Sequence, residues 1–135
     1  MRDFDIQGIA IDVAGSKAFT FIADPSRLPA WAHAFASVSE GRAIMRTPNG
    51  EVGIDLEVHA SAESGTVDWQ MRFPNGSVAR AHSRVVATGS DRCIYVFLLA
   101  PPPVPLEELE GTLEAQSRTL TDELRRLKEL LEHDA

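Results

Sequence analysis

Three polar side chains, His33, Tyr95 and Gln116, are the residues best suited to acid–base chemistry on a bound molecule. A neutral imidazole can exchange a proton near neutral pH, and a buried tyrosine hydroxyl needs a hydrogen-bond partner, which a ligand oxygen could supply. Each residue also has a structural interpretation: a surface histidine at a helix end, a tyrosine bonded to protein, and a less buried helix turn. Both interpretations stay open, so we assign no catalytic residue.

Metal and covalent chemistry have little support in the sequence. His33, His59 and His82 are far apart, and no His-x-x-x-His or Cys-x-x-Cys spacing occurs. The single cysteine, Cys93, is expected outside the core or at a strand start, with no base beside it in sequence, which argues against a nucleophilic role. We therefore expect no metal and no cofactor.

Two copies of one turn motif organise the elements that would position these groups. Pro-Asn-Gly follows Thr47 and again follows Phe73. Proline presets φ for the first turn position, and glycine takes a left-handed third position without a Cβ clash, so each motif predicts a three-residue hairpin loop. Together with turns elsewhere they predict about six strands, at residues 4–13, 41–47, 51–60, 66–73, 77–88 and 92–100.

The turn type sets the register of each hairpin, and the register shows which side chains share a face. Centring the second hairpin on Asn75 pairs Trp69 with Ala81, Met71 with Ala79 and Val67 with Ser83 on one face, and Asp68 with His82 and Gln70 with Arg80 on the other. Centring the first on Asn49 sets Ile44 opposite Ile54 and Arg46 opposite Val52, with Val52, Ile54, Leu56 and Val58 on the apolar face. Such a one-sided sheet needs a cover. Its polar face predicts a solvated surface or a protein-interaction patch.

The C-terminal segment supplies the cover. Leucines recur at steps of three, four and seven from Leu106 to Leu131, which predicts an amphipathic helix of roughly 27 residues. Gln116 and Ser117 interrupt the stripe. At that turn the helix meets something polar, is less buried, or faces a cavity in which the two residues anchor a ligand.

Two short helices are expected between the first strand and the hairpins, at 17–23 and about 25–33. Asp24-Pro25 starts the second, because aspartate caps helices and proline favours the first helical position. Trp31 and Phe35 lie four residues apart and would share a face of that helix.

These features resemble a known superfamily. The run Ala18-Phe19-x-Phe21-Ile22-x-Asp24-Pro25-x-x-Leu28-Pro29-x-Trp31, the two Pro-Asn-Gly turns and the closing helix resemble the START-like superfamily, also called SRPBCC or polyketide-cyclase-like, which includes the birch-pollen-allergen fold. The resemblance covers nearly the whole chain. It implies one α+β helix-grip domain over residues 1–135, a curved antiparallel sheet around a long helix. The superfamily includes lipid carriers, hormone receptors and aromatase/cyclases, so the fold does not specify the function.

The same resemblance implies an apolar ligand cavity between sheet and helix, entered between the short helices and the long one. Small inward residues such as Ala79 and Ser83 would make room in it. The expected ligand-binding residues are Trp31, His33, Ile54, Leu56, Trp69, Met71, Ala81, Tyr95, Phe97, Leu109, Leu113 and Gln116. The aromatic members of this set would form either a ligand cage or plain core.

The composition of the chain indicates which classes of partner to exclude and which compartment to expect. The formal net charge of −7 argues against nucleic acid and anionic lipid surfaces, which need excess lysine and arginine. A single cysteine fits a reducing cytosol, and the N-terminus has no signal-peptide pattern. The longest apolar run, 93–104, is too short for a membrane span. We expect a cytoplasmic protein with no integral membrane segment, for which a homodimer is an option.

Three functions fit these features. The preferred hypothesis is a binder or carrier of a small hydrophobic molecule, because no catalytic set is evident. The second is a polyketide cyclase or aromatase-like enzyme, which would require His33, Tyr95 and Gln116 to converge in one cavity. The third is a protein-interaction module of the co-chaperone kind, which would have a filled interior or a large exposed apolar patch.

Overall fold

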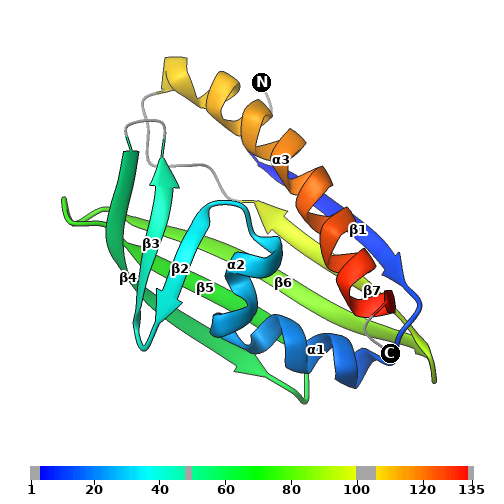
Figure 1. The fold of residues 1–135 in the computed structure, drawn as a ribbon. Helices are drawn as coiled ribbons and strands as arrows, with labels where there is room; N and C mark the ends of the chain where they lie inside the picture. Colours follow the sequence, from blue (N-terminus) through cyan, green and yellow to red (C-terminus); the bar gives the residue numbers. More distant parts are fainter. Residues whose placement is uncertain (1–3, 48–49, 100–105, 134–135) are drawn as a thin grey trace.

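A computed structural model describes residues 4–47, 50–99 and 106–133 of the chain. A seven-stranded antiparallel sheet, in the order β1-β7-β6-β5-β4-β3-β2, curves beside the long helix α3, while the shorter helices lie at one end of the sheet (Figure 1). Along the chain the elements are β1 Asp5–Ile11, α1 Gly15–Ala23, the 3-10 helix η1 Pro25–Arg27, α2 Leu28–Trp31, β2 Phe35–Ser39, β3 Arg42–Thr47, β4 Gly50–Ser61, β5 Thr66–Arg72, β6 Val78–Gly89, β7 Arg92–Leu99 and α3 Leu106–His133. This is the predicted helix-grip architecture.

Strand β2 is an element that the sequence did not predict. Helix α2 ends at Trp31 because Ala32 turns to an extended conformation, and Phe35 then begins β2. Trp31 and Phe35 therefore do not share a helix face, although both side chains are buried. The strand escaped prediction because it contains two serines and an alanine and lacks the alternation of large apolar residues that marks other strands.

The register of the second hairpin is confirmed at every predicted pair. Trp69 lies opposite Ala81 and Asp68 lies opposite His82. The loop between these strands is also as predicted: the amide of Gly76, at φ +87°, donates to the carbonyl of Phe73 at 2.9 Å. The left-handed glycine therefore sets which face of β5 and β6 is buried.

The register of the first hairpin was wrong by one residue. Thr47 pairs with Gly50, so two residues rather than three separate the paired positions, and residues 48–49 lie outside the described part. Ile44 consequently lies opposite Gly53 instead of Ile54, and Arg46 lies opposite Glu51 instead of Val52. Since a one-residue shift exchanges the two faces of a strand, Ala43 is buried while Ile44 is 37% exposed.

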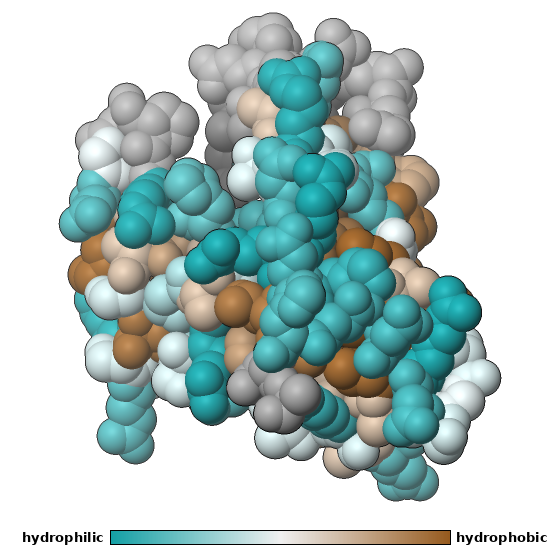
Figure 2. Space-filling view, turned by 45° about the vertical axis from the view of Figure 1, so that its right-hand side comes forward, coloured by the Kyte–Doolittle hydropathy of each residue, from teal (hydrophilic) through white to brown (hydrophobic). Residues whose placement is uncertain are grey.

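Helix α3 buries its leucine stripe against the sheet. The described members of the stripe are at most 3% exposed: Leu113, Leu120, Leu124, Leu127 and Leu131. Each buried leucine contributes about 1.5–3 kcal/mol of transfer free energy, so this stripe is the main attachment of the helix. The side chains of Leu106 and Leu109 lie outside the described part. Figure 2 shows the solvent face of α3 as a hydrophilic band with apolar side chains on both sides of it.

At the interruption of the stripe, α3 makes a polar contact with β1. Gln7 Nε2 donates to the backbone carbonyl of Ser117 at 2.9 Å and to Asp5 Oδ2 at 2.8 Å. Thr121 Oγ1 in turn donates to Gln7 Oε1 at 3.0 Å. The helix therefore meets a polar group of an edge strand at this turn, as one of the three alternatives predicts, through its backbone and Thr121. The contact does not involve the side chain of Ser117, which lines a cleft at the same turn.

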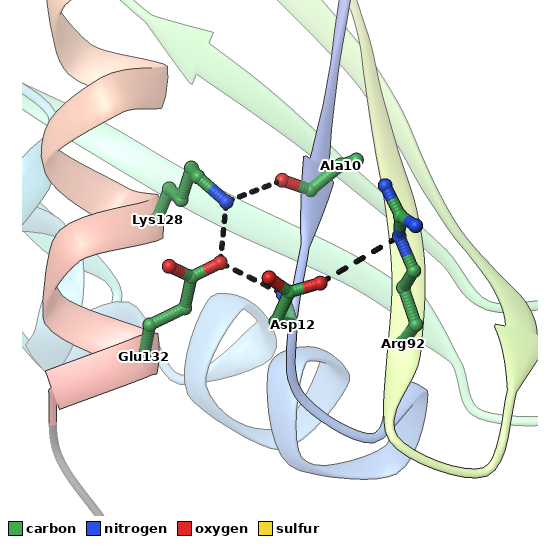
Figure 3. A network of polar contacts seen from close by, with 5 residues as sticks. All are labelled: Ala10, Asp12, Arg92, Lys128 and Glu132. Carbon is green, nitrogen blue, oxygen red and sulfur yellow. Dashed lines mark hydrogen bonds and ion pairs between the residues drawn. The ribbon is translucent and has the colours of Figure 1, made fainter.

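A second polar contact between α3 and β1 closes the edge of the sheet (Figure 3). Lys128 Nζ donates to the carbonyl of Ala10 at 3.0 Å, and the amide of Asp12 donates to Glu132 Oε2 at 2.8 Å. Lys128 and Glu132 also pair with each other. Two side chains of the helix thus satisfy backbone groups that a neighbouring strand would otherwise bond.

Candidate functional site

Four aromatic rings pack together between the sheet and the helices, and we refer to Trp31, Trp69, Tyr95 and Phe97 as the aromatic cluster. Trp31 meets the rings of Trp69 and Tyr95 edge to face, with centroids 6.4 and 6.2 Å apart. Trp69 stacks on Phe97 at 5.8 Å. The cluster has room because the residue opposite Trp69 on β6 is the small Ala81. Its rings come from α2, β5 and β7, so distant parts of the chain meet here.

The cluster contains polar atoms with no partner. In the described part of the chain, Trp31 Nε1, Trp69 Nε1 and Tyr95 Oη are buried and form no hydrogen bond. Ser117 Oγ, beside the Gln7 contact, is also buried and forms no hydrogen bond. An indole N–H can only donate, so both tryptophans need an acceptor oxygen or nitrogen. Unpartnered buried polar groups cost about 1–3 kcal/mol each, and native structures contain few of them.

Tyr95 is held in its neutral form. Burial raises the pKa of its phenol far above the ordinary value, the nearby hydroxyl of Ser83 lowers it in part, and the charges of Glu123 and Asp68 raise it further. The Ser83 hydroxyl donates to the carbonyl of Val67 at 2.6 Å, and the phenol has no hydrogen-bond partner within the described residues. Tyr95 is therefore a hydrogen-bond donor that stays protonated over the whole physiological pH range.

A cleft opens from the surface to the cluster between α2 and α3. It encloses about 340 Å³ and is lined by Pro29, Ala30, Trp31, His33, Arg46, Thr119, Asp122, Glu123 and Arg126. We call it the α2–α3 cleft. Trp31 belongs both to this cleft and to the aromatic cluster, so it forms the wall between the surface and the interior.

Glu123 is the residue of this cleft with the most unusual environment. Burial raises the pKa of its carboxyl from the ordinary value of 4.5 to about 7, against the lowering effect of a hydrogen bond from the backbone N–H of His33 to Oε2. No arginine contributes to this shift. The two arginines of the cleft contact the backbone instead: Arg126 Nε donates to the carbonyl of Ala30 at 2.6 Å and Arg46 Nη1 donates to the carbonyl of His33 at 2.8 Å. Glu123 is a partly buried acid that titrates near neutral pH.

Sequence reasoning missed Glu123, although the sequence carries a signal for it. Leu109, Gln116, Glu123 and Leu130 recur every seven residues, so this row of α3 has leucine at both ends and two polar residues between them. The spacing that singles out Gln116 therefore also singles out Glu123, one heptad further along. A charged residue inside an apolar stripe is a candidate for a shifted pKa.

The structure brings together only part of the predicted ligand-binding set. The four aromatic residues are in contact, and four others are buried in the same core: Ile54, Leu56, Met71 and Ala81. Leu113 is also buried, while the side chain of Leu109 lies outside the described part. His33 is exposed but lines the α2–α3 cleft, and Gln116 is half-buried.

Two clefts of the described part do not bring the three acid–base candidates together. The first contains His33 but neither Tyr95 nor Gln116. The second, also of about 340 Å³, surrounds the contact between Gln7 and Ser117 and contains none of the three.

The position of Cys93 corrects a further expectation. It lies at the start of β7, as expected, but its side chain is fully buried and not outside the core, and burial raises the pKa of its thiol. The cause is the register of β7, which points Cys93 to the same face as Tyr95. Within residues 4–47, 50–99 and 106–133, no three His, Cys, Asp or Glu side chains are grouped as a metal site requires.

Comparison with known structures identifies the fold. Over 98% of this chain and 99% of the other, the structure superposes on a START superfamily protein from Mycobacterium smegmatis with a TM-score of 0.74 at 12% sequence identity. The chain has the START-like fold. A second START-like match is the Zhui aromatase/cyclase from Streptomyces sp. R1128, with a TM-score of 0.71 at 8% identity over 96% of this chain and 93% of that one.

A third match covers one half of a larger START-like protein. The di-domain aromatase/cyclase BexL from the BE-7585A biosynthetic pathway has a TM-score of 0.69 at 14% identity, over 96% of this chain and 46% of its own. No family model matches the sequence, and no curated protein matches it. Among the described helices, none is long and apolar enough to cross a membrane.

Proposed function

We propose that this START-like protein binds a small, largely apolar molecule that carries hydrogen-bond acceptors. The observation that carries the proposal is the aromatic cluster with its three unpartnered donors, Trp31 Nε1, Trp69 Nε1 and Tyr95 Oη. Apolar walls with a few convergent polar groups are the usual composition of a small-molecule site.

The chemistry of the donors narrows the ligand class. Because an indole N–H cannot accept, a ligand that satisfies both tryptophans must bring oxygen or nitrogen acceptors, and flat aromatic rings suit the stacked walls. Aromatic or polycyclic ketones combine the two features. Two of the structural matches are named aromatase/cyclases, which is consistent with this class. The proposed contacts are Trp31, Trp69, Tyr95 and Phe97, with Ile54, Leu56, Met71, Ala81 and Leu113 around them.

A matched ligand pair tests the proposal. Trp31 and Trp69 are the two tryptophans of the chain, so intrinsic fluorescence reports on the cluster. Titration with fluorenone and with fluorene, which differ by one carbonyl oxygen, should show fluorenone binding about tenfold more tightly, the value of one hydrogen bond. Tyr95→Phe should reduce this ratio. Ile94→Ala is the control, since Ile94 lies on the outer face of the same strand.

The proposal fails if neither compound binds and denaturing extraction of the pure protein yields no co-purified small molecule. Native mass spectrometry of the same sample counts the subunits, which decides whether the protein is a homodimer.

A second candidate function is acid–base catalysis on the bound molecule, and Glu123 is the observation that favours it. A carboxyl group with a pKa of about 7, placed in the cleft that leads to the cluster, can take and return a proton at neutral pH. Once a ligand is identified, mass spectrometry after incubation tests for turnover. A catalytic role predicts that Glu123→Gln retains binding and loses turnover.

A further inference from the structure

The residues of α2 and the two that follow it, 28–33, form the outer cover of the aromatic cluster, and we call them the α2 segment. The segment places Trp31 against Trp69 and Tyr95. Trp31 also lines the α2–α3 cleft, so a molecule that passes from this cleft into the cluster must displace the segment.

Three side chains from other elements hold the α2 segment by its backbone. Glu123 of α3 accepts from the amide of His33, Arg126 of α3 donates to the carbonyl of Ala30, and Arg46 of β3 donates to the carbonyl of His33. Within the segment the helical bonding amounts to a single turn, closed by the amide of Ala32 on the carbonyl of Leu28 at 2.7 Å. The buried side chains of Leu28, Trp31 and Ala32 also anchor the segment, and the outside bonds add to that anchoring because a single turn has few backbone bonds of its own.

Glu123 differs from the two exposed arginines because its side chain is partly buried where it meets the segment. The charged or titratable groups around it are Asp122 and Arg126 on its own helix, His33 on the segment, Arg46 on β3 and Tyr95 on β7. Neither arginine forms an ion pair with Glu123 in the described part of the chain, and each donates to a backbone carbonyl of the segment. The ionised carboxylate is thus poorly compensated while the segment is docked, and displacement of the segment would return it to water.

We propose that the α2 segment is a latch over the aromatic cluster and that ionisation of Glu123 releases it. The proposal rests on the proposed binding function and adds its regulation. The sign follows from linkage: the docked state binds the Glu123 proton more tightly than the released state, so protonation stabilises the docked state and rising pH favours release. The protein takes up and discharges its ligand more readily at neutral and higher pH than at pH 5.

Amide hydrogen exchange measured by NMR from pH 5 to pH 8.5 tests the latch without a ligand. The reporters are the amides of Ala32 and His33, each rate divided by its intrinsic rate at that pH. In the wild-type protein their protection should fall by up to about tenfold per pH unit between about pH 5 and pH 7, and then level off. The isosteric variant Glu123→Gln should keep high protection that does not change with pH.

Two controls separate the latch from general effects. Glu132→Gln removes another acid of α3 that accepts a backbone N–H, that of Asp12, and should leave the pH dependence of the Ala32 and His33 amides unchanged. The amide of Trp69, in the centre of the sheet, should keep its protection throughout. The latch is overturned if wild-type protection at Ala32 and His33 is constant or rises with pH, if Glu123→Gln shows the same fall, or if Trp69 loses protection in parallel.

Stopped-flow binding of the apolar dye anilinonaphthalene sulfonate separates the latch from the binding function. If the dye binds, its association rate should rise with pH in the wild-type protein and stay constant in Glu123→Gln, and the opposite pattern overturns the latch. If no dye or ketone binds at any pH while the exchange pattern is found, the binding function fails and the latch stands.

Discussion

Lys128 of α3 donates from Nζ to the backbone carbonyl of Ala10 on β1, 118 residues earlier in the chain, at 3.0 Å. This bond closes an edge of the sheet with a side chain instead of a strand. The ammonium group is held in place by Glu132, one turn further along the helix, and Glu132 in turn accepts the amide of Asp12. The helix is therefore attached to the sheet by polar bonds at its outer margin as well as by its buried leucines.

Replacing Lys128 by methionine should destabilise the protein by about 1–2 kcal/mol, because the Ala10 carbonyl loses a partner in a part-buried position. The matched control is Arg118→Met, which removes an exposed ion pair with Glu114 at the same helical spacing and should change the free energy of unfolding by less than about 0.5 kcal/mol. Urea unfolding measures both. Equal losses of unfolding free energy in the two variants would show that the bond between Lys128 and Ala10 stabilises the protein no more than an exposed ion pair does.

Two glycines with the same backbone angle predict different costs for alanine. Gly65 has φ +75° and an added Cβ would lie 2.3 Å from the carbonyl oxygen of Val85, whereas Gly41 has φ +72° and nothing within 4 Å. Gly41→Ala should cost about 1 kcal/mol of left-handed strain, and Gly65→Ala about 3 kcal/mol or more, because the backbone of β6 must move. Thermal unfolding checks the order. Equal costs would contradict the close approach at Val85.

The stability of Glu123→Gln relative to the wild-type protein should depend on pH. The folded pKa of Glu123, about 7, is raised above the ordinary value of 4.5, so its contribution to stability is fully present below about pH 4.5 and is lost as pH rises through 7. The variant should therefore be more stable than the wild type by about 2 kcal/mol at pH 8, with partial exposure taken into account, and similar to it at pH 4.

Glu132→Gln is the control of opposite sign for this titration. Hydrogen bonds from Lys128 and from the amide of Asp12 lower the pKa of Glu132, so its stabilising contribution is present at neutral pH and is lost in acid. Urea unfolding of both variants at pH 4 and pH 8 gives the comparison. If the free energy of unfolding of Glu123→Gln differs from that of the wild-type protein by the same amount at pH 4 and pH 8, the pKa of Glu123 is not raised by burial.

Removing the phenol oxygen of Tyr95 should not destabilise the free protein. The hydroxyl is buried without a hydrogen-bond partner, so Tyr95→Phe removes an unsatisfied group and should raise the free energy of unfolding by about 1 kcal/mol. Ser83→Ala is the contrast, because it removes a bond to the Val67 carbonyl at 2.6 Å and should destabilise. A loss on Tyr95→Phe of more than 1 kcal/mol would mean that the hydroxyl has a partner in solution.

The architecture and the register of the second hairpin could be predicted from local patterns in the sequence. The Pro-Asn-Gly turn after Phe73 sets the register of β5 and β6 because glycine takes φ +87° there, and that register places Trp69 and Ala81 on the buried face. The leucine spacing determined the length and inward face of α3. These features are readable because they depend on residues a few positions apart, where turn chemistry and helical periodicity act.

The candidate site, in contrast, depends on contacts between residues that are far apart in the sequence. The same three-residue motif after Thr47 joins strands with a different register, because pairing along β3 and β4 buries Ala43 and Ile54 together. The bond between Glu123 and the His33 amide spans 90 residues, and the bond between Lys128 and Ala10 spans 118. The pKa of Glu123 and the isolation of the Tyr95 hydroxyl follow from desolvation by segments distant in sequence, and desolvation is a property of the packed molecule that no local pattern encodes.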